Sequence, residues 1–239
     1  MKNWTYSILL ALALAIGAGA QAQTFDESMA AYRQGNYATA IAGFRKLAER
    51  GNVSAQYNLG LIYEDGRVPK DDKQAAFWYR KAAEQGDAIA QGNLGVMYAN
   101  GRGVPKDDQQ AVFWYRKAAE QGNARAQYNL GVMYADGRGV PKDDKQAVFW
   151  YRKAAEQGNA RAQVNLGLMY EDGQGVPKDD QQAYFWWLLA SAGGDRNAAS
   201  NRDKVERRLT PEQRASAQAR ARNWQPNPPP SKPRGVHRL

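Results

Sequence analysis

The chain has 239 residues, a formal net charge of +9, one His and no Cys. The lack of Cys excludes disulfides, thiol nucleophiles and Cys-based metal sites. The one His is His237, almost at the C-terminus, so catalysis by a positioned His and metal sites built from several His are excluded too.

The excess positive charge lies at the C-terminal end. From Arg196 onward the sequence carries 11 Lys and Arg against 3 Asp and Glu, which leaves about +1 for everything before it. Such a segment attracts phosphate or anionic lipid surfaces, which would make it a tether to a nucleic acid or a membrane. The simpler interpretation is solvated charge on terminal helices, and we expect no nucleic-acid partner.

Residues 1–22 have the pattern of a secretory signal peptide. Lys2 supplies the positive n-region, residues 8–20 form a short apolar run, and small-x-small cleavage patterns end at Ala20 and Ala22. The apolar run is shorter than the roughly 20 residues that a membrane helix needs. The sequence therefore predicts a periplasmic or secreted bacterial protein with no stable membrane insertion after signal removal. An uncleaved N-terminal anchor is the alternative.

Residues 23–50 predict an atypical helical pair that caps the N-terminal end of the fold. Apolar residues have helix-type spacing on both sides of the break at 34–36. Terminal units of a repeat array are expected to be atypical because one of their faces has no neighbour.

Residues 51–193 consist of four copies of one unit of about 36 residues, and a period of this length is typical of a repeat architecture. The copies span residues 51–85, 86–121, 122–157 and 158–193.

Each copy predicts two helices. In the third copy Asn123 is suited to cap a first helix that runs to about Ala135, and the Gly and Pro residues of 137–141 end it. Asp143 is suited to cap the second helix, which ends before Gly158. One unit buries too little apolar surface to fold alone, so the units must stack into an all-α solenoid.

A glycine stands in the middle of every first helix, where it costs roughly 1 kcal/mol relative to Ala. The four equivalents are Gly60, Gly95, Gly131 and Gly167. We therefore expect the two helices to approach closely there, with the glycine admitting a large neighbour such as Trp150.

The repeated residues resemble those of the Sel-one-like repeat family, relatives of the tetratricopeptide repeats. The third copy carries the motif in Ala126, Leu130, Gly131, Tyr134, Gly137, Gly139, Val140, Asp143, Ala147, Trp150, Tyr151, Ala154, Ala155 and Gly158. The resemblance implies a right-handed superhelix of stacked helix-turn-helix repeats that serves as a protein-interaction scaffold. Some secreted relatives are described as penicillin-binding or β-lactamase-like, but these are crosslinked by disulfides, which this chain lacks.

Residues 194–224 predict two helices that cap the C-terminal end of the solenoid. The fourth copy reads Trp187-Leu188-Leu189 where the others read Tyr-Arg-Lys. Because two leucines replace the charged Arg-Lys pair, we expect another segment to cover this part of the helix. Thr210 and Pro211 have the pattern of a helix start. Residues 225–239 are Pro-rich and basic and predict a disordered tail.

Acidic pairs are the candidates for chemistry, and most of them have a structural explanation. Asp107–Asp108, Asp143–Asp144 and Asp179–Asp180 recur at one repeat position and suit helix capping. Glu64 and Glu171 end first helices, an unfavourable place for an acid. Because no Ser-x-x-Lys pair, nucleophile elbow or phosphate loop is present, we expect no enzyme, no cofactor and no metal site.

One face of the first helices varies among the otherwise similar copies. The variable positions are spaced i, i+3, i+7 and i+10, within about 80° of one helix face. Stacked first helices typically line the concave surface of a solenoid, where partners bind. The alternative is that these positions are solvent-exposed and vary without functional consequence. Several of the residues are apolar or aromatic, which favours a binding surface. The predicted contacts are Tyr57, Ile89, Arg125, Tyr128, Arg161 and Val164.

Two further positions carry the same residue in every copy, one an Asn and the other a Phe. Asn58, Asn93, Asn129 and Asn165 border the variable face, where they either clamp a peptide backbone or form a ladder between helices; we favour the ladder. Phe77, Phe113, Phe149 and Phe185 are expected to pack between repeats.

The sequence thus predicts an exported, monomeric, non-enzymatic scaffold that binds a protein or peptide on the concave face of the solenoid. The alternative is a binder of peptidoglycan fragments or a cell-wall or β-lactam-active enzyme, which would use the carboxylates of Glu64 and Glu171.

Overall fold

The computed structural model describes residues 24–228, and all regular secondary structure in that range is helical. The signal peptide predicted at residues 1–22 and the tail from 229 onward lie outside the described residues. The helices are α2 (Phe25–Arg33), α3 (Tyr37–Glu49), α4 (Val53–Asp65), α5 (Asp72–Glu84), α6 (Ala88–Asn100), α7 (Asp108–Glu120), α8 (Ala124–Asp136), α9 (Asp144–Glu156), α10 (Ala160–Asp172), α11 (Asp180–Ala192), α12 (Arg196–Glu206) and α13 (Pro211–Asn223).

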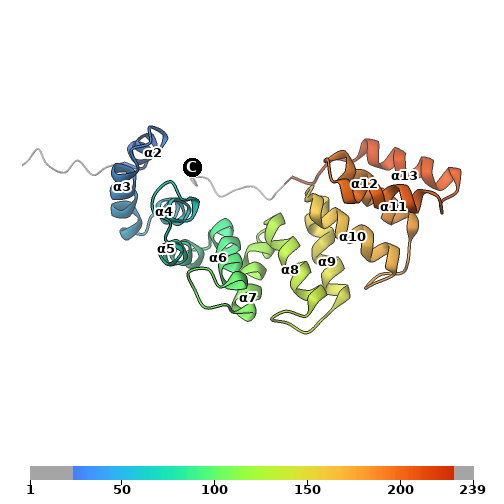
Figure 1. The fold of residues 1–239 in the computed structure, drawn as a ribbon, viewed down its shortest axis with the longest axis horizontal. Helices are drawn as coiled ribbons and strands as arrows, with labels where there is room; N and C mark the ends of the chain where they lie inside the picture. Colours follow the sequence, from blue (N-terminus) through green and yellow to red (C-terminus); the bar gives the residue numbers. More distant parts are fainter. Residues whose placement is uncertain (1–23, 229–239) are drawn as a thin grey trace, which may run out of the picture.

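The helices pack in sequence order into a crescent (Figure 1). In each repeat the first helix (α4, α6, α8 or α10) packs against its own second helix (α5, α7, α9 or α11), which then packs against the next repeat. Figure 1 shows α4 and α6 toward the inner side of the crescent, and α5 and α7 toward its outer side. The predicted α-solenoid is confirmed; its right-handed sense stays a prediction.

Side-chain caps set the start of each helix, as the sequence predicts. The Asn123 side chain accepts a hydrogen bond from the Ala126 amide at the start of α8. Asp143 accepts one from the Gln146 amide at the start of α9, and its equivalents do the same in the other repeats. The first acid of each Asp pair is thus committed to capping.

Each mid-helix glycine faces a large aromatic ring, but the predicted neighbour of Gly131 is wrong. A Cβ added at Gly131 would lie 2.6 Å from the Tyr151 ring, so Tyr151 occupies the gap rather than Trp150. Trp150 is also buried and contacts Phe149 instead. Adjacent residues on a helix point about 100° apart, and the spacing in the sequence did not separate these two aromatic residues.

A ladder of buried glutamines joins successive repeats, and the sequence interpretation missed it. Gln127 Nε2 donates to the Ala119 carbonyl (3.0 Å), and Gln157 Nε2 donates to Gln127 Oε1 (2.7 Å). Gln56 and Gln91 make the same two bonds in the first two repeats. These bonds satisfy polar groups that would otherwise be costly to bury. The available signal was an invariant Gln at one repeat position.

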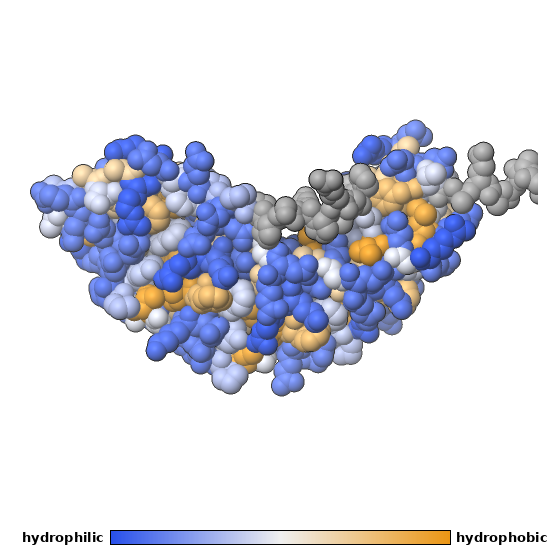
Figure 2. All heavy atoms as spheres, turned by 180° about the vertical axis from the view of Figure 1, so that it is seen from behind, coloured by the Kyte–Doolittle hydropathy of each residue, from blue (hydrophilic) through white to orange (hydrophobic). Residues whose placement is uncertain are grey.

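Three of the four repeated phenylalanines lie on the surface, so the expectation that they pack between repeats is wrong for these three. Phe77, Phe113 and Phe149 are 49%, 45% and 45% exposed, and each ring packs edge-on against the Trp that follows it. Phe185 is 4% exposed because α13 covers it, with the Arg220 guanidinium 4.3 Å from the ring centroid. Figure 2 shows how hydrophobic surface breaks into separate patches among hydrophilic side chains.

The C-terminal helices α12 and α13 both pack on α11, whose Trp187 is fully buried. The helix start predicted at Thr210 and Pro211 is present as the start of α13, where Thr210 and Gln213 form a capping box. The first residues of the predicted disordered tail are placed on the solenoid: the Asn227 amide donates to the Glu156 carbonyl (2.7 Å). The ordered chain therefore continues past Trp224.

Candidate functional site

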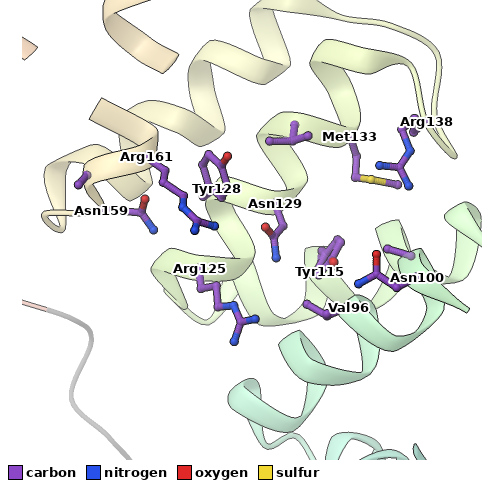
Figure 3. Close-up of a pocket in the computed structure, with 13 residues that line it drawn as sticks. Val96, Asn100, Tyr115, Arg125, Tyr128, Asn129, Met133, Arg138, Asn159 and Arg161 are labelled. Carbon is purple, nitrogen blue, oxygen red and sulfur yellow. The ribbon is translucent and has the colours of Figure 1, made fainter. Parts of the chain in front are cut away.

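The candidate site is a pocket of about 560 Å³ that spans three consecutive repeats (Figure 3). It lies between α6, α8 and the start of α10, with α7 and the α8–α9 loop contributing one residue each. Its lining residues are Val96, Ala99, Asn100, Tyr115, Arg125, Tyr128, Asn129, Val132, Met133, Arg138, Asn159, Ala160 and Arg161.

Four of the ten candidate residues, which are the six predicted contacts and the four repeated asparagines, meet in this pocket. Arg125, Tyr128 and Asn129 come from α8, and Arg161 comes from the first turn of α10. The stacking of repeats brings them together, because equivalent positions of neighbouring first helices become adjacent in a solenoid.

The other predicted residues lie elsewhere. Ile89, Asn93, Val164 and Asn165 are on α6 and α10 but do not line the pocket. Tyr57 and Asn58 are 8% and 0% exposed, so their side chains offer almost no surface to a partner. Tyr57 packs on the Tyr79 ring (5.9 Å between centroids), and the Asn58 amide lies 4.0 Å from the Met29 sulfur of α2.

Two of the repeated asparagines act on the tyrosine of the preceding repeat. Burial raises the pKa of the Tyr79 and Tyr151 hydroxyls, and polar contact with the Asn93 and Asn165 side chains opposes that rise. These contacts join neighbouring repeats, as in the favoured ladder interpretation. The equivalent Asn129 lines the pocket, as does Tyr115 of the preceding repeat.

The pocket is rich in positive charge. Arg138 is held by Asp108, with Nη2 2.7 Å from Oδ1 and Nε 3.3 Å from Oδ2, and this bond raises the pKa of the Arg138 guanidinium. Arg125 and Arg161 are exposed, and no ion pair within the described residues engages either of them. Burial raises the pKa of the Tyr115 hydroxyl to about 12, and the positive charges of Arg125 and Arg138 oppose that rise.

An apolar surface adjoins these charges. Tyr128 packs on Tyr151 with 6.0 Å between ring centroids, and Val96, Val132 and Met133 complete the apolar part of the lining. Aromatic and Arg side chains beside apolar surface are typical anchors of protein interfaces. The arrangement suits a ligand that is itself amphipathic, such as a peptide.

The two carboxylates on which the enzymatic alternative depends are engaged in contacts between repeats. Glu64 accepts hydrogen bonds from the Tyr79 hydroxyl (2.7 Å) and from Arg102 (3.0 Å). Glu171 accepts one from Arg208 (2.6 Å). Neither residue lines the pocket, and these contacts give both a structural role.

Two lining residues that the sequence interpretation did not select are Tyr115 and Arg138. Tyr115 is the counterpart of the motif residue Tyr151, and Arg138 lies in the loop between the two helices of the third copy. A comparison of loop positions among the copies could have singled out Arg138, because the fourth copy has Gln174 there. Within residues 24–228, no cluster of His, Cys, Asp or Glu could hold a metal ion, and no helix is long and apolar enough to cross a membrane.

Comparisons with known proteins agree with this architecture. The family model of the Sel1 repeat matches residues 53–87, 88–123, 124–159 and 160–195, each segment starting two residues after a copy predicted from the sequence. The chain is similar to a protective antigen of uropathogenic Escherichia coli that displays an SLR fold, with a TM-score of 0.75 and 39% identity. That match covers 84% of this chain and 44% of the antigen, so the chain spans less than half of the antigen's length.

A second similar structure is a Sel1 repeat protein from Oxalobacter formigenes, with a TM-score of 0.68 and 39% identity over 73% of this chain and 72% of that one. Comparison with curated proteins gave no match.

Proposed function

The chain belongs to the Sel1 repeat family, whose members generally mediate protein–protein interaction, and from that premise we propose that it binds a protein or peptide in the pocket between α6, α8 and α10. Families of this kind are typically non-enzymatic, and we propose a binding role without catalysis. The proposal rests most on the pocket itself, which joins Arg125, Tyr128 and Arg161 from two repeats beside apolar surface.

The pocket has the features that an extended ligand would need. Its width across three repeats lets several side chains of a peptide bind at once, while exposed Arg and half-buried Tyr supply anchors. The scaffold around it is held by the Gln ladder and the glycine contacts, so the binding surface is formed before the partner arrives.

The double substitution Arg125→Ala and Tyr128→Ala is expected to weaken partner capture by at least about 30-fold, because each removes an anchor worth roughly 1–2 kcal/mol or more. Partner retained from cell-envelope extract on the immobilised protein is measured by quantitative mass spectrometry, with circular dichroism as the check on folding. The matched control removes a cation and an aromatic ring outside the pocket, Lys153→Ala with Phe149→Ala. Equal capture by wild type and the pocket variant would refute the proposal.

We also propose that the protein is exported to the periplasm or beyond. The support is the pattern of residues 1–22, with its positive start, short apolar run and small-residue cleavage patterns. The mass of the chain isolated from the envelope fraction is expected to be lower by the mass of about 20–22 N-terminal residues. Recovery of the intact chain in the cytoplasm would contradict export.

A further inference from the structure

A carboxylate joins the first repeat to the second. Glu64, near the end of α4, accepts the Tyr79 hydroxyl (2.7 Å) and Arg102 Nη1 (3.0 Å). Arg102 Nη2 also binds Asp72 at the start of α5 (2.9 Å). The Tyr hydroxyl and one arm of the Arg thus converge on a single carboxylate, while the second arm is held by Asp72.

The same junction recurs along the array with informative differences. At the fourth junction Glu171 pairs with Arg208, which also binds Asp180, so both the acid and the arginine are present. At the third junction both are absent, with Ala135 and Gln174 at the two positions. The acid and the arginine are therefore kept together or lost together at these three junctions.

The second junction breaks this rule. Its arginine, Arg138, is present, but alanine stands at position 99, where Glu64 stands one repeat earlier. Asp108 still binds the Arg138 guanidinium, through Nε and Nη2, where Asp72 binds that of Arg102 through Nη2 alone. No hydrogen bond within the described residues engages Arg138 Nη1 or the Tyr115 hydroxyl.

The space that the Glu64 carboxylate fills in the first repeat opens, in the second repeat, into the pocket. Ala99, Tyr115 and Arg138 all line it, and Figure 3 shows the Tyr115 and Arg138 side chains at the same cavity as Arg125 and Asn129. Asp108 and Asp136 are the acidic groups whose charges act on Arg138. Asp108 is already paired, so Arg125, Arg138 and Arg161 leave the pocket with a surplus of positive charge.

We propose that the pocket binds a carboxylate of the partner at Tyr115 and Arg138, in the position that the Glu64 carboxylate takes one repeat earlier. The inference rests on the proposed function, since it assigns the chemistry of the peptide group that this pocket receives. A carboxylate accepts the Tyr hydroxyl and an Arg N–H at once, a charge-assisted arrangement that the first repeat already displays. The carboxylate comes from an Asp or Glu side chain or from the C-terminus of a chain.

Three small probes test the chemistry on the full-length protein. N-acetylglutamate amide carries only a side-chain carboxylate, N-acetylglutamine carries only a terminal carboxylate, and N-acetylglutamine amide carries neither. Nuclear magnetic resonance follows the Arg138 Nε–H signal, assigned by its loss in Arg138→Gln, during titration into the millimolar range. At least one carboxylate probe is expected to produce a saturable shift at concentrations at least about tenfold lower than the neutral amide. The more potent probe identifies the source of the carboxylate.

Two alanine variants supply a matched pair. Ala99→Glu builds the carboxylate of the first repeat into the second, so we expect it to occupy the site and weaken probe binding at least about tenfold. Ala135→Glu adds the same side chain at the third junction, where Gln174 stands, and is expected to leave probe binding unchanged. Circular dichroism checks that both variants fold. If Ala99→Glu does not fold, Arg138→Gln serves instead, with loss of the shift in the Tyr115 ring signals as the readout.

The two proposals fail in different ways. No saturable shift in wild type, equal shifts in wild type and the folded Ala99→Glu protein, or a stronger response to inorganic phosphate than to either carboxylate would overturn the carboxylate site. Partner capture that still depends on Arg125 and Tyr128 would in that case leave the binding pocket in place with a different ligand chemistry. Capture that is indifferent to Arg125 and Tyr128 would overturn the pocket itself.

Discussion

The substitution Gly139→Ala is expected to lower the free energy of unfolding by about 3–5 kcal/mol. Gly139 has φ +69°, in the left-handed region that disfavours residues with a side chain, and an added Cβ would overlap the backbone carbonyl of Asp108 in the preceding repeat. Backbone cannot move aside as a flexible side chain does. Urea denaturation followed by circular dichroism measures the loss.

Gly86→Ala is the matched control for this prediction. Gly86 has φ +92° and nothing within 4 Å of the added Cβ, so its substitution has only the backbone cost of about 1–2 kcal/mol. Equal losses in the two variants would show that contact between repeats at Gly139 contributes nothing. The neighbouring residue, Arg138, is part of the proposed site, so the close packing at Gly139 also positions the backbone from which the Arg138 side chain extends.

Trp187→Ala is expected to cost about 3–5 kcal/mol, the range for removing a large buried aromatic side chain. Trp187 is fully buried, fills the space above Gly167, and donates its indole N–H to the Val164 carbonyl (3.1 Å). Losing the ring opens a cavity between α10 and α11, within the core that α12 and α13 share. Thermal unfolding followed by circular dichroism measures the effect.

The chain provides its own control for Trp187. Tyr stands at the equivalent position in the first three repeats, where Tyr79, Tyr115 and Tyr151 pack on Gly60, Gly95 and Gly131. Trp187→Tyr is therefore expected to retain most of the stability that Trp187→Ala loses. If the two variants were equally unstable, ring packing on the glycine would not be the source of the stabilisation.

The sequence predicted the fold well because each structural signal recurs in every copy. Capping by Asn123 and Asp143 depends on local geometry alone, so four repetitions make those helix starts unambiguous. Contacts between helices were harder to predict from the sequence. Choosing between Trp150 and Tyr151 requires the helix rotation, and the burial of Gln127 requires knowledge that its partner Gln157 lies beside it.

The candidate site was predictable in part for the same reason. The variable face of the first helices pointed to Arg125, Tyr128 and Arg161, which line the pocket. It could not show that Tyr57 is buried, because that depends on how the first repeat packs around it. Arg138 was missed because a loop position gives no helical periodicity, and its role follows only from its pairing with a residue 30 positions earlier.

Site-specific photocrosslinking tests the central claim, that the partner occupies the pocket, most directly. A p-benzoylphenylalanine side chain is placed at Val132 inside the pocket, or at the exposed Phe149 outside it, and crosslinked peptides from envelope preparations are sequenced. We predict one partner segment crosslinked from position 132, absent when Arg125→Ala and Tyr128→Ala are added. Crosslinking of the same partner from position 149 and not from position 132 would contradict the account.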